Sequence, residues 1–507
     1  MQTVLEQPTT SQSFNSFLPD FKGRLHDLFQ VENDINKVSL TRGLPPSMMQ
    51  EILSMKPLSV AVPTAFGGRG MDVSQCLRVL AAASYESLSL SLIFGINIAL
   101  FLEPFAKYGN PLIKESVFRK FMEENAMGGL MITEPNYGSD ALNMRTSYQQ
   151  TDAGIHLTGQ KHWQGLTGAA DFWLVAGRKR AENGDLARDV DFFMTDNSVA
   201  SQQIEVSTLY NNLGLYAIPY GVNEIDVQLP AEQALQPEST GIKLMLDMLH
   251  RSRMQFPGMG MGFIKRLLDE SLQHCEARKV SGMSLTELDG VKYQLSRIQA
   301  AYTLCSGMCS HSSAVSSITF DLALQGIEAN SMKALVTDLM QESAQISLQL
   351  AGANGYRLDH IAGRSVVDSR PFQIFEGSNE MLYAQIAEGV LKLMRKGKET
   401  NLLAFLKQYP ATALAAADFA GNIDFKIPES AKQRELIVLG RIIARVICFQ
   451  YVLQMDNLGF NKQLTQQSFE HMKMDISMFV GQLQSANFSN PFKVYEDSSD
   501  WTQFIKA

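Results

Sequence analysis

The chain has 507 residues, of which 45% are hydrophobic and 19% charged, and this is the composition of a folded globular protein with several domains. Its net charge of −8 and the lack of a sizeable basic patch argue against a nucleic-acid-binding protein. The five cysteines match neither a disulfide scaffold nor a zinc pattern, so we expect no metal site and a reducing, cytoplasmic setting.

The order of the predicted elements divides the chain into four parts. The first residues, MQTVLEQPTTSQSF, lack the basic and apolar regions of a signal peptide, and helical segments then fill an N-terminal domain over 1–130. Over 131–240 the apolar period falls to two, which predicts a β domain. Its expected strands are DFWLVAGR (171–178), DVDFFMTD (189–196) and EIDVQLP (224–230). Helices return in a domain over 241–396 and continue in an extension over 397–507.

The longest apolar run, ELIVLGRIIARVICFQYVL (435–453), contains Arg441 and Arg445. Two charges near its centre would strongly destabilise a membrane-spanning helix. We therefore predict a buried or partner-facing amphipathic helix and no membrane span.

Three segments combine turn-forming or small residues with groups able to bind a ligand. In MITEPNYGSD (131–140), proline and glycine force a turn that frees the hydroxyls of Thr133 and Ser139 for a planar polar ligand. GQKHW (159–163) is predicted to begin a strand, and Trp163 is more often a core residue than a cofactor wall. QLAGANGY (349–356) follows a helix, and its small residues allow close approach of a phosphate or another chain.

The segment PFQIFEGSNE (371–380) places one carboxylate, Glu376, between an apolar run and a glycine. One interpretation is a helix start, in which Ser378 or Asn379 caps the helix that follows. The other is a desolvated carboxylate that acts as a base.

These segments, in this order and at these separations, resemble the motifs of the acyl-CoA dehydrogenase family of flavoproteins over residues 40–395. The matching segments are MITEPNYGSD, GQKHW, ARKVSG (277–282), QLAGANGY and FQIFEGSNE. The resemblance implies an α+β fold with an N-terminal helical domain, a middle β-barrel-like domain and a C-terminal four-helix bundle. This chain adds a helical C-terminal extension.

The resemblance also implies an FAD-dependent oxidation of an acyl thioester between Cα and Cβ, with Glu376 as the base that removes the α proton. Phe372, Ile374 and Phe375 would supply an apolar surround that raises its pKa. Gly377 would leave room for the substrate, and the N–H of Glu376 would bind the thioester carbonyl.

Further contacts are implied residue by residue. The residues implied to contact FAD are Met131, Ile132, Thr133, Ser139, Trp163, Thr167, Arg278, Gln349, Gly352, Ser378 and Glu380. Of these, Ser139 is implied for FAD or for the acyl-CoA, and Arg278, Gln349 and Gly352 would act across a subunit interface. Arg253 resembles an arginine that orders residues 371–380 around Glu376, here called the catalytic segment. A solvated helix arginine is the alternative.

The sequence departs from the family pattern at several cofactor positions. Ser281 stands where the family has phenylalanine, and Ala353 replaces the second glycine of a pair. The family's glycine-leucine-arginine becomes Gly214-Leu-Tyr216. One extra residue after Trp163 leaves open whether Gly165 or Thr167 faces the flavin.

The expected partners follow from the same resemblance. They are an acyl-CoA or an acyl-carrier-protein thioester, an electron-transfer flavoprotein or oxygen as acceptor, and a second copy of the chain, with a homodimer favoured over a homotetramer. A flavin monooxygenase of the same fold and a non-catalytic assembly factor are the alternatives, and the intact glutamate-glycine motif argues against both.

The helix LSLSLIFGINIALFLEPF (88–105) is implied to line the end of the acyl cavity. If Gly95 faces the cavity, there is room for more methylene groups, but if Ile96 does, the end is closed. A glycine that relieves a helix–helix contact is the alternative for Gly95. The C-terminal extension, shared with very-long-chain members, favours a medium to long chain.

Overall fold

The computed structural model describes residues 12–152, 154–427, 430–484 and 505. Its N-terminal part is helical, and the long apolar helix pair α5 and α6 is joined by a π-helical turn over Ile98–Leu102. The helices are α1 (Phe14–His26), α2 (Ile35–Val38), α3 (Pro46–Ser54), α4 (Val73–Glu86), α5 (Leu88–Asn97), α6 (Glu103–Tyr108) and α7 (Pro111–Glu123). Side chains of Asp72 and Ser87 cap α4 and α5, so two tightly packed helices follow each other with one residue between them.

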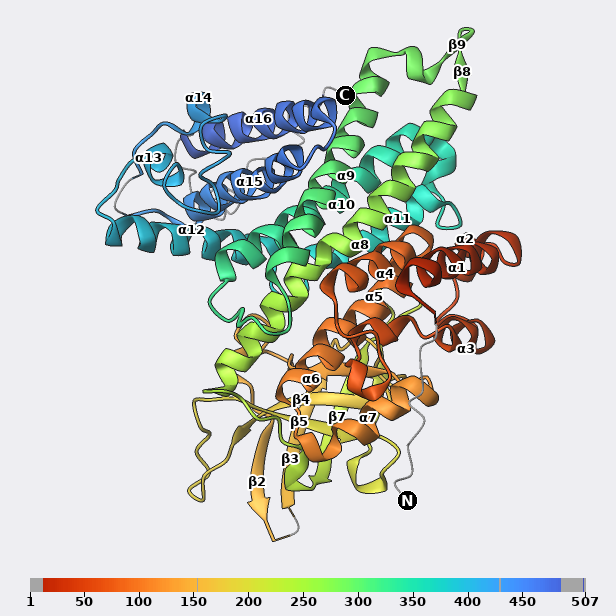
Figure 1. Ribbon diagram of the computed structural model, residues 1–507, viewed down its shortest axis with the longest axis vertical. Coiled ribbons are helices and arrows are strands. Elements are labelled where there is room, and N and C mark those ends of the chain that lie inside the picture. The colour runs from red at the N-terminus through yellow and green to blue at the C-terminus, as the bar shows by residue number, and fades with distance from the viewer. Residues whose placement is uncertain (1–11, 153, 428–429, 485–504, 506–507) are drawn as a thin grey trace.

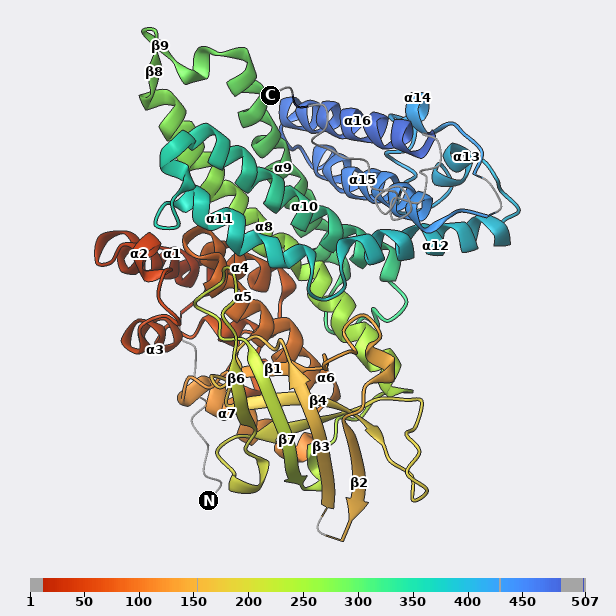
Figure 2. The same cartoon turned by 180° about the vertical axis from the view of Figure 1, so that it is seen from behind.

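The middle of the chain forms one curled sheet beneath these helices (Figure 2). Its strands are β1 (Gly128–Met131), β2 (Ser147–Thr151), β3 (Gly154–His162), β4 (Phe172–Lys179), β5 (Asp191–Asp196), β6 (Glu205–Leu209) and β7 (Gly221–Leu229). The order is β1-β4-β2-β3-β7-β6, with β5 paired to β4. β1 pairs with β4 in parallel, so the strand that ends the N-terminal helical region belongs to the sheet.

The sequence predicted three of these strands closely, namely β4, β5 and β7. The prediction that GQKHW begins a strand was wrong, because residues 159–162 end β3 and Trp163 lies just beyond it. The motif therefore sits where the chain leaves the sheet.

The C-terminal helices form a bundle around the 37-residue helix α8 (Gly241–Ala277), which packs against α4, α9 and α10 (Figure 1). The other elements are the hairpin β8 (Lys279–Val280) and β9 (Met283–Ser284), and helices α9 (Asp289–Val315), α10 (Gly326–Ala351), α11 (Ile361–Ser369) and α12 (Asn379–Lys396). Because α8 runs from the bundle down toward the sheet, it connects the two parts of the fold.

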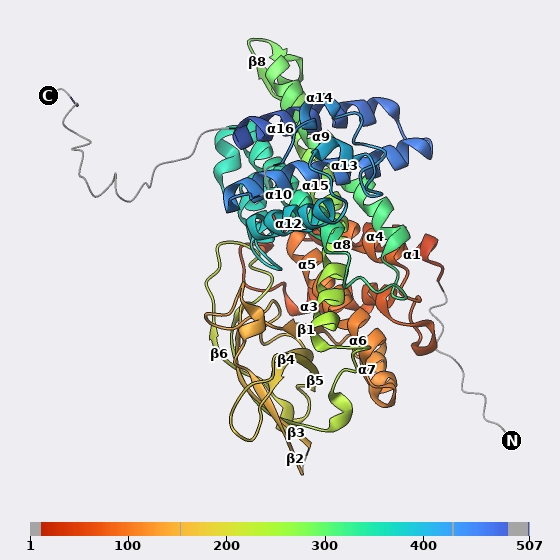
Figure 3. The same ribbon diagram turned by 90° about the vertical axis from the view of Figure 1, so that its left-hand side faces the viewer.

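The extension adds helices α13 (Leu402–Leu406), α14 (Ala420–Ile423), α15 (Gln433–Asn457) and α16 (Lys462–Gln484). Helix α15 packs against α9, α10 and α12, and α16 packs against α9 and α15 (Figure 3). The crossing with α12 is close, since a Cβ on Gly440 would lie 1.9 Å from the carbonyl oxygen of Tyr383. The predicted α+β fold with a helical extension is confirmed.

Two helical stretches, Leu88–Tyr108 and Gln433–Asn457, are long and apolar enough to cross a membrane by length and composition alone. Their most apolar windows are 94% and 78% buried inside the protein, so they are weak evidence for a span. Arg445, in the second stretch, is buried and pairs with Asp475 of α16, its Nε 3.1 Å from the carboxylate.

Candidate active site

The segment between α11 and α12 turns sharply at two consecutive residues with left-handed backbone conformations. Glu376 has φ 53° and Gly377 has φ 93°, and a non-glycine residue in this region is uncommon. The Ser378 hydroxyl then accepts a hydrogen bond of 3.4 Å from the Met381 N–H and caps α12. The helix-start interpretation is therefore correct, and it leaves Glu376 on the turn that precedes the helix.

Two buried cations bind the carbonyl groups of this turn. Arg253 on α8 donates from Nη2 to the Glu376 carbonyl at 2.8 Å and from Nη1 to Asn330 at 2.7 Å. Lys333 on α10 donates from Nζ to the Gly377 carbonyl, also at 2.8 Å. Arg253 is only 6% exposed, so the alternative of a solvated helix arginine is wrong.

The carboxylate of Glu376 has one polar partner. Ser252 Oγ donates to its Oε1 at 3.0 Å, whereas Oε2 is buried and has no hydrogen-bond partner among the residues that the structure describes. Burial raises the pKa of Glu376, and the opposing effects of Arg253, Ser252 and Lys333 do not cancel it. A carboxylate with a raised pKa and a free oxygen is suited to take up a proton.

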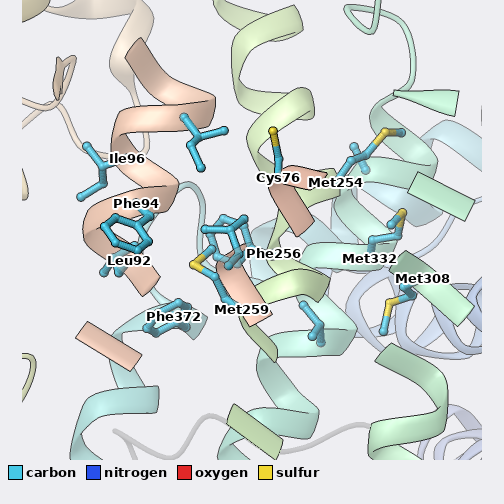
Figure 4. Close-up of a cluster of buried hydrophobic side chains, with 14 of the residues drawn as sticks. Cys76, Leu92, Phe94, Ile96, Met254, Phe256, Met259, Met308, Met332 and Phe372 are labelled. Carbon is cyan, nitrogen blue, oxygen red and sulfur yellow. The ribbon is translucent and has the colours of Figure 1, made fainter. Parts of the chain in front are cut away.

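Aromatic rings surround the catalytic segment. The Phe372 and Phe375 ring centroids are 4.9 Å apart, and Phe256 on α8 lies 6.0 Å from each. Figure 4 shows Phe256 and Met259 between helix α5 and the rest of the buried cluster. The prediction that Ile374 contributes to this apolar surround was wrong, because Ile374 is 56% exposed.

Gly377 is required by the backbone. Besides its positive φ, a Cβ there would lie 2.8 Å from Met381 Cε and 3.0 Å from Leu382 Cδ2. Backbone and packing therefore give their own reasons for this glycine, and the room it would leave for a substrate stays a prediction. The preceding N–H, that of Glu376, donates no hydrogen bond within the described residues and is free for a carbonyl oxygen.

The loop after β1 is fixed by a buried ion pair that sequence reasoning missed. Lys161 Nζ lies 2.9 Å from Glu134 Oε1, and the same carboxylate accepts the N–H groups of Arg145 and Thr146. Burial lowers the pKa of Lys161 to about 8, although Glu134 opposes the shift. The pair joins MITEPNYGSD to GQKHW, and Thr133 lies beside it, its carbonyl accepting the His162 N–H at 3.0 Å.

Trp163 lies directly after β3 with φ 61° and a side chain that is 52% exposed. Its ring centroid is 4.5 Å from that of Tyr210 and 6.1 Å from that of Tyr220. The interpretation of Trp163 as a core residue is wrong, because the ring presents an open aromatic surface at the sheet's end.

Thr167 has no group available for a cofactor. It is 1% exposed, its hydroxyl donates to the Gln164 carbonyl at 2.8 Å, and it accepts from Asn223 at 3.2 Å. The predicted cofactor contact at Thr167 is therefore wrong. Gly165 is part-exposed and approaches Ile96, whose Cδ1 would lie 2.6 Å from a Cβ there.

Gly95 faces neighbouring helices instead of an acyl cavity. A Cβ on Gly95 would lie 3.3 Å from Met259 Sδ on α8 and 3.9 Å from Leu80 Cδ2 on α4. The open-cavity prediction at Gly95 is wrong, and the helix–helix contact is the correct reason for this glycine.

The remaining predicted contacts lie apart from Glu376 or on the surface. Met131 is buried and Ile132 is half-buried at the end of β1. The exposed residues are Ser139, Arg278, Gln349, Gly352 and Glu380. Arg278 ends α8 beside the hairpin, and Gly352 ends α10 with φ 64° and open space where a Cβ would be. Among the described residues, neither of the two has a hydrogen bond or ion pair with residues 371–380.

A cavity of about 290 Å³ lies in the extension, away from this site. It is lined by Phe425, Lys426, Ile427, Ala431, Glu435, Leu439, Val480, Leu483 and Gln484. None of these residues belongs to the catalytic segment, and the lining offers no group paired for acid–base chemistry.

Three family models match the chain in sequence. Residues 30–125, 129–226 and 239–391 match the models described as the N-terminal, middle and C-terminal domains of acyl-CoA dehydrogenase. Together they cover well over half of the chain and leave the extension outside.

Among curated proteins, the chain is 24% identical over 425 residues to the very long-chain specific acyl-CoA dehydrogenase, mitochondrial, of Rattus norvegicus. This match covers 82% of the chain and 62% of the relative, so the chain spans less than two thirds of that protein. The short-chain specific acyl-CoA dehydrogenase of Megasphaera elsdenii is 24% identical over 358 residues, with 66% of the chain and 87% of the relative covered.

Among solved structures, an acyl-CoA dehydrogenase complexed with FAD from Bacillus anthracis superposes with a TM-score of 0.75. The match covers 96% of this chain and 91% of that one at 16% identity, which shows a shared fold.

Proposed function

Because this chain belongs to the acyl-CoA dehydrogenase family, we propose that it oxidises a saturated acyl thioester to the trans-2-enoyl thioester with FAD as cofactor. The observation that carries the proposal is Glu376, a buried carboxylate with one unpartnered oxygen on a turn held by two cations. Such a group is suited to remove a weakly acidic α proton.

The described residues fit a flavin. Trp163 offers an open aromatic face at the end of β3, and the loop of Thr133 lies beside it, fixed by the Glu134–Lys161 pair. Gly352 presents backbone with no side chain in the way, as a nucleotide contact requires. When bound, FAD supplies the acceptor for the hydride that leaves the substrate Cβ.

The chain's own residues carry out the proton chemistry. Glu376 takes the α proton through its carboxylate, and its raised pKa brings its basicity closer to neutral pH. The free N–H of Glu376 donates to the thioester carbonyl and stabilises the negative charge that develops on that oxygen. The Phe372, Phe375 and Phe256 rings limit the access of water to the carboxylate.

We propose a medium to long acyl chain, carried by coenzyme A or by an acyl-carrier protein. Gly95 no longer supports this chain length, so the support comes from the C-terminal extension. The similarity to the rat very-long-chain relative covers 82% of the chain, so it must run past residue 391, where the family models end. A chain-length series of saturated acyl-CoAs tests this, because the preference for a long chain predicts kcat/KM rising with added carbons.

We further propose a homodimer in which Arg278, Gln349 and Gly352 of one copy complete the FAD site of the other. This would account for their exposure. Arg278→Ala should then weaken FAD retention, and light scattering that shows a monomer with full flavin would contradict the proposal.

An electron-transfer flavoprotein is the proposed acceptor. The five free cysteines support a reducing, cytoplasmic location.

The test of the function is to purify the protein and add acyl-CoA without oxygen. A yellow protein that is bleached by a saturated acyl-CoA and yields the 2-enoyl product is the expected result. A yellow protein that is inert to every thioester but hydroxylates a substrate with reduced flavin would be a monooxygenase. A colourless protein that binds partner proteins would be an assembly factor.

A further inference from the structure

We propose that Lys333 positions the base: its ammonium and the Arg253 guanidinium hold the consecutive carbonyl groups of Gly377 and Glu376, and thereby fix the turn that aims the Glu376 carboxylate. This inference rests on the proposed function, since it concerns the base of that reaction. Lys333 has no role in the family resemblance set out above.

The contacts of Lys333 are fixed from several sides. Its side chain is fully buried, and Nζ donates to the Gly377 carbonyl at 2.8 Å and to Asn379 Oδ1 at 3.1 Å. Asn379 is itself 2% exposed and donates to the Ala334 carbonyl at 3.0 Å and to Asp338 Oδ1 at 2.7 Å. A lysine tied to both the turn and the first residue of α12 has little freedom to move.

The turn needs these donors because of its backbone conformation. Neither the Glu376 nor the Gly377 carbonyl accepts a hydrogen bond from a main-chain N–H within the described residues. A carbonyl that loses water without gaining a partner is destabilising, and a non-glycine residue at φ 53° adds backbone strain. Arg253 and Lys333 offset both costs with charge-assisted hydrogen bonds, so losing either cation favours a relaxed backbone.

The positive charge of Lys333 also acts on the carboxylate. Burial lowers the pKa of Lys333, while Glu376 raises it, so the two groups stabilise each other's charged forms. The other charged groups that face Lys333 are Arg253 on α8, Asp338 on α10 and Glu380 on α12. A neutral side chain of the same length would therefore lose the hydrogen bonds and this attraction together.

The test compares Lys333→Met with Lys107→Met in the full-length holoenzyme. Lys107 is a matched control, because it is a largely buried lysine that pairs with Asp247 and donates to a main-chain carbonyl outside the site. We expect Lys333→Met to retain FAD and to bind octanoyl-CoA or palmitoyl-CoA with an unchanged Kd. Its flavin should be bleached roughly 10²-fold more slowly, which is the effect expected when a base is misplaced by about 1 Å. Lys107→Met should be bleached at the wild-type rate.

Two measurements separate positioning from general damage and from failure of the proposed function. Propylammonium added to Lys333→Ala should restore part of the bleaching rate. Hydrogen–deuterium exchange over residues 370–382, measured without substrate, should be faster in Lys333→Met than in wild type and unchanged in Lys107→Met. If Lys333→Met does not fold, Lys333→Gln keeps a donor in the site and serves in its place.

Each outcome decides one question. Wild-type exchange and a wild-type bleaching rate in the folded Lys333 variant would overturn the positioning role while leaving the proposed function intact. A wild-type protein that no acyl thioester bleaches would overturn the function, and exchange over the turn would still show whether Lys333 holds it.

Discussion

Lys161 Nζ lies 2.9 Å from Glu134 Oε1, and the two side chains are 0% and 4% exposed. The ion pair joins the loop after β1 to the end of β3, so Thr133 and Trp163 are held on one rigid support. The two motifs that the sequence presents separately are thus a single structural unit.

The first prediction concerns this pair. Lys161→Met leaves the Glu134 carboxylate buried without its cation, and removing one partner of a buried pair typically costs about 3–5 kcal/mol. We expect a lower thermal midpoint and weaker FAD retention, measured by differential scanning fluorimetry and by flavin absorbance after gel filtration. Lys179→Met, at an exposed position of β4, is the control. An unchanged midpoint with full flavin in Lys161→Met would contradict this role.

The second prediction tests the base. Glu376→Gln keeps the size of the side chain, but the amide cannot take up the α proton. We therefore expect FAD to stay bound and the anaerobic bleaching rate to fall by ~10²–10⁴-fold or more. Stopped-flow absorbance of the flavin band is the measurement. Glu380→Gln, an exposed carboxylate four residues on, should retain far more activity. Near-normal bleaching of Glu376→Gln would remove the assignment.

The third prediction concerns the hydroxyl that donates to Glu376. Ser252 lowers the pKa of Glu376 against the effect of burial, so Ser252→Ala should raise that pKa further. The hydrogen bond stabilises the charged carboxylate, so its loss favours the protonated form. The acid limb of the kcat/KM profile should move to higher pH, while the plateau is kept. Ser271→Ala, a buried serine on the same helix, should leave the profile in place.

The fourth prediction follows from the packing of Gly95. Gly95→Leu forces a branched side chain against Met259 and Leu80, and overpacking of this kind typically costs about 1–3 kcal/mol. In Gly95→Ala, the only tight contact of the new Cβ is with the flexible tip of Met259, while Leu80 stays at ordinary contact distance, so this variant should be tolerated. Chemical denaturation measures both. A Gly95→Leu protein of wild-type stability with a shorter preferred acyl chain would restore the cavity interpretation.

The fifth prediction is a pH dependence of stability. Burial raises the pKa of Glu103 from its ordinary value of 4.5 to about 7, and Arg251 and Gln255 oppose the shift only in part. The folded protein therefore binds this proton more tightly than the unfolded chain, so the contribution of Glu103 to stability falls as the pH rises from about 4.5 to 7. Glu103→Gln should remove up to about 3 kcal/mol of that fall, measured by urea unfolding at several pH values. The exposed Glu182→Gln is the control. Parallel curves for Glu103→Gln and wild type would refute the shift.

The sequence predicted the helical and β regions because their periodicity covers long segments. The first six residues of β4 are buried, and β7 has buried residues at alternate positions. By contrast, β1 contains two glycines and β2 is mostly polar, so neither has a clear pattern. β3 was missed upstream of GQKHW, although Ile155 and Leu157 alternate there as buried residues. Short strands of this kind are specified by their neighbours in the sheet.

For the candidate site, the sequence indicated Glu376 and Arg253 through motifs. Lys333 gave no local signal, since the carbonyl it binds lies 44 residues further along the chain. The side to which Gly95 points depends on how α5 is rotated against α4 and α8. The sequence does not reveal this rotation, because every residue of α5 is buried, including its two serines and Asn97. Contacts that depend on tertiary packing cannot be deduced from local spacing.

The position of α15 gives the chain a particular order of assembly during synthesis. Helices α9, α10 and α12 all precede α15 in the chain, yet each of them packs against it. The ribosome therefore completes these three helices before α15 exists. Until then, the groups that pack against Gly440 and Tyr451, among them Tyr383 and His311, lack this cover. At this stage the nascent chain already contains Glu376 and the helices around it, but its uncovered apolar surface can still aggregate.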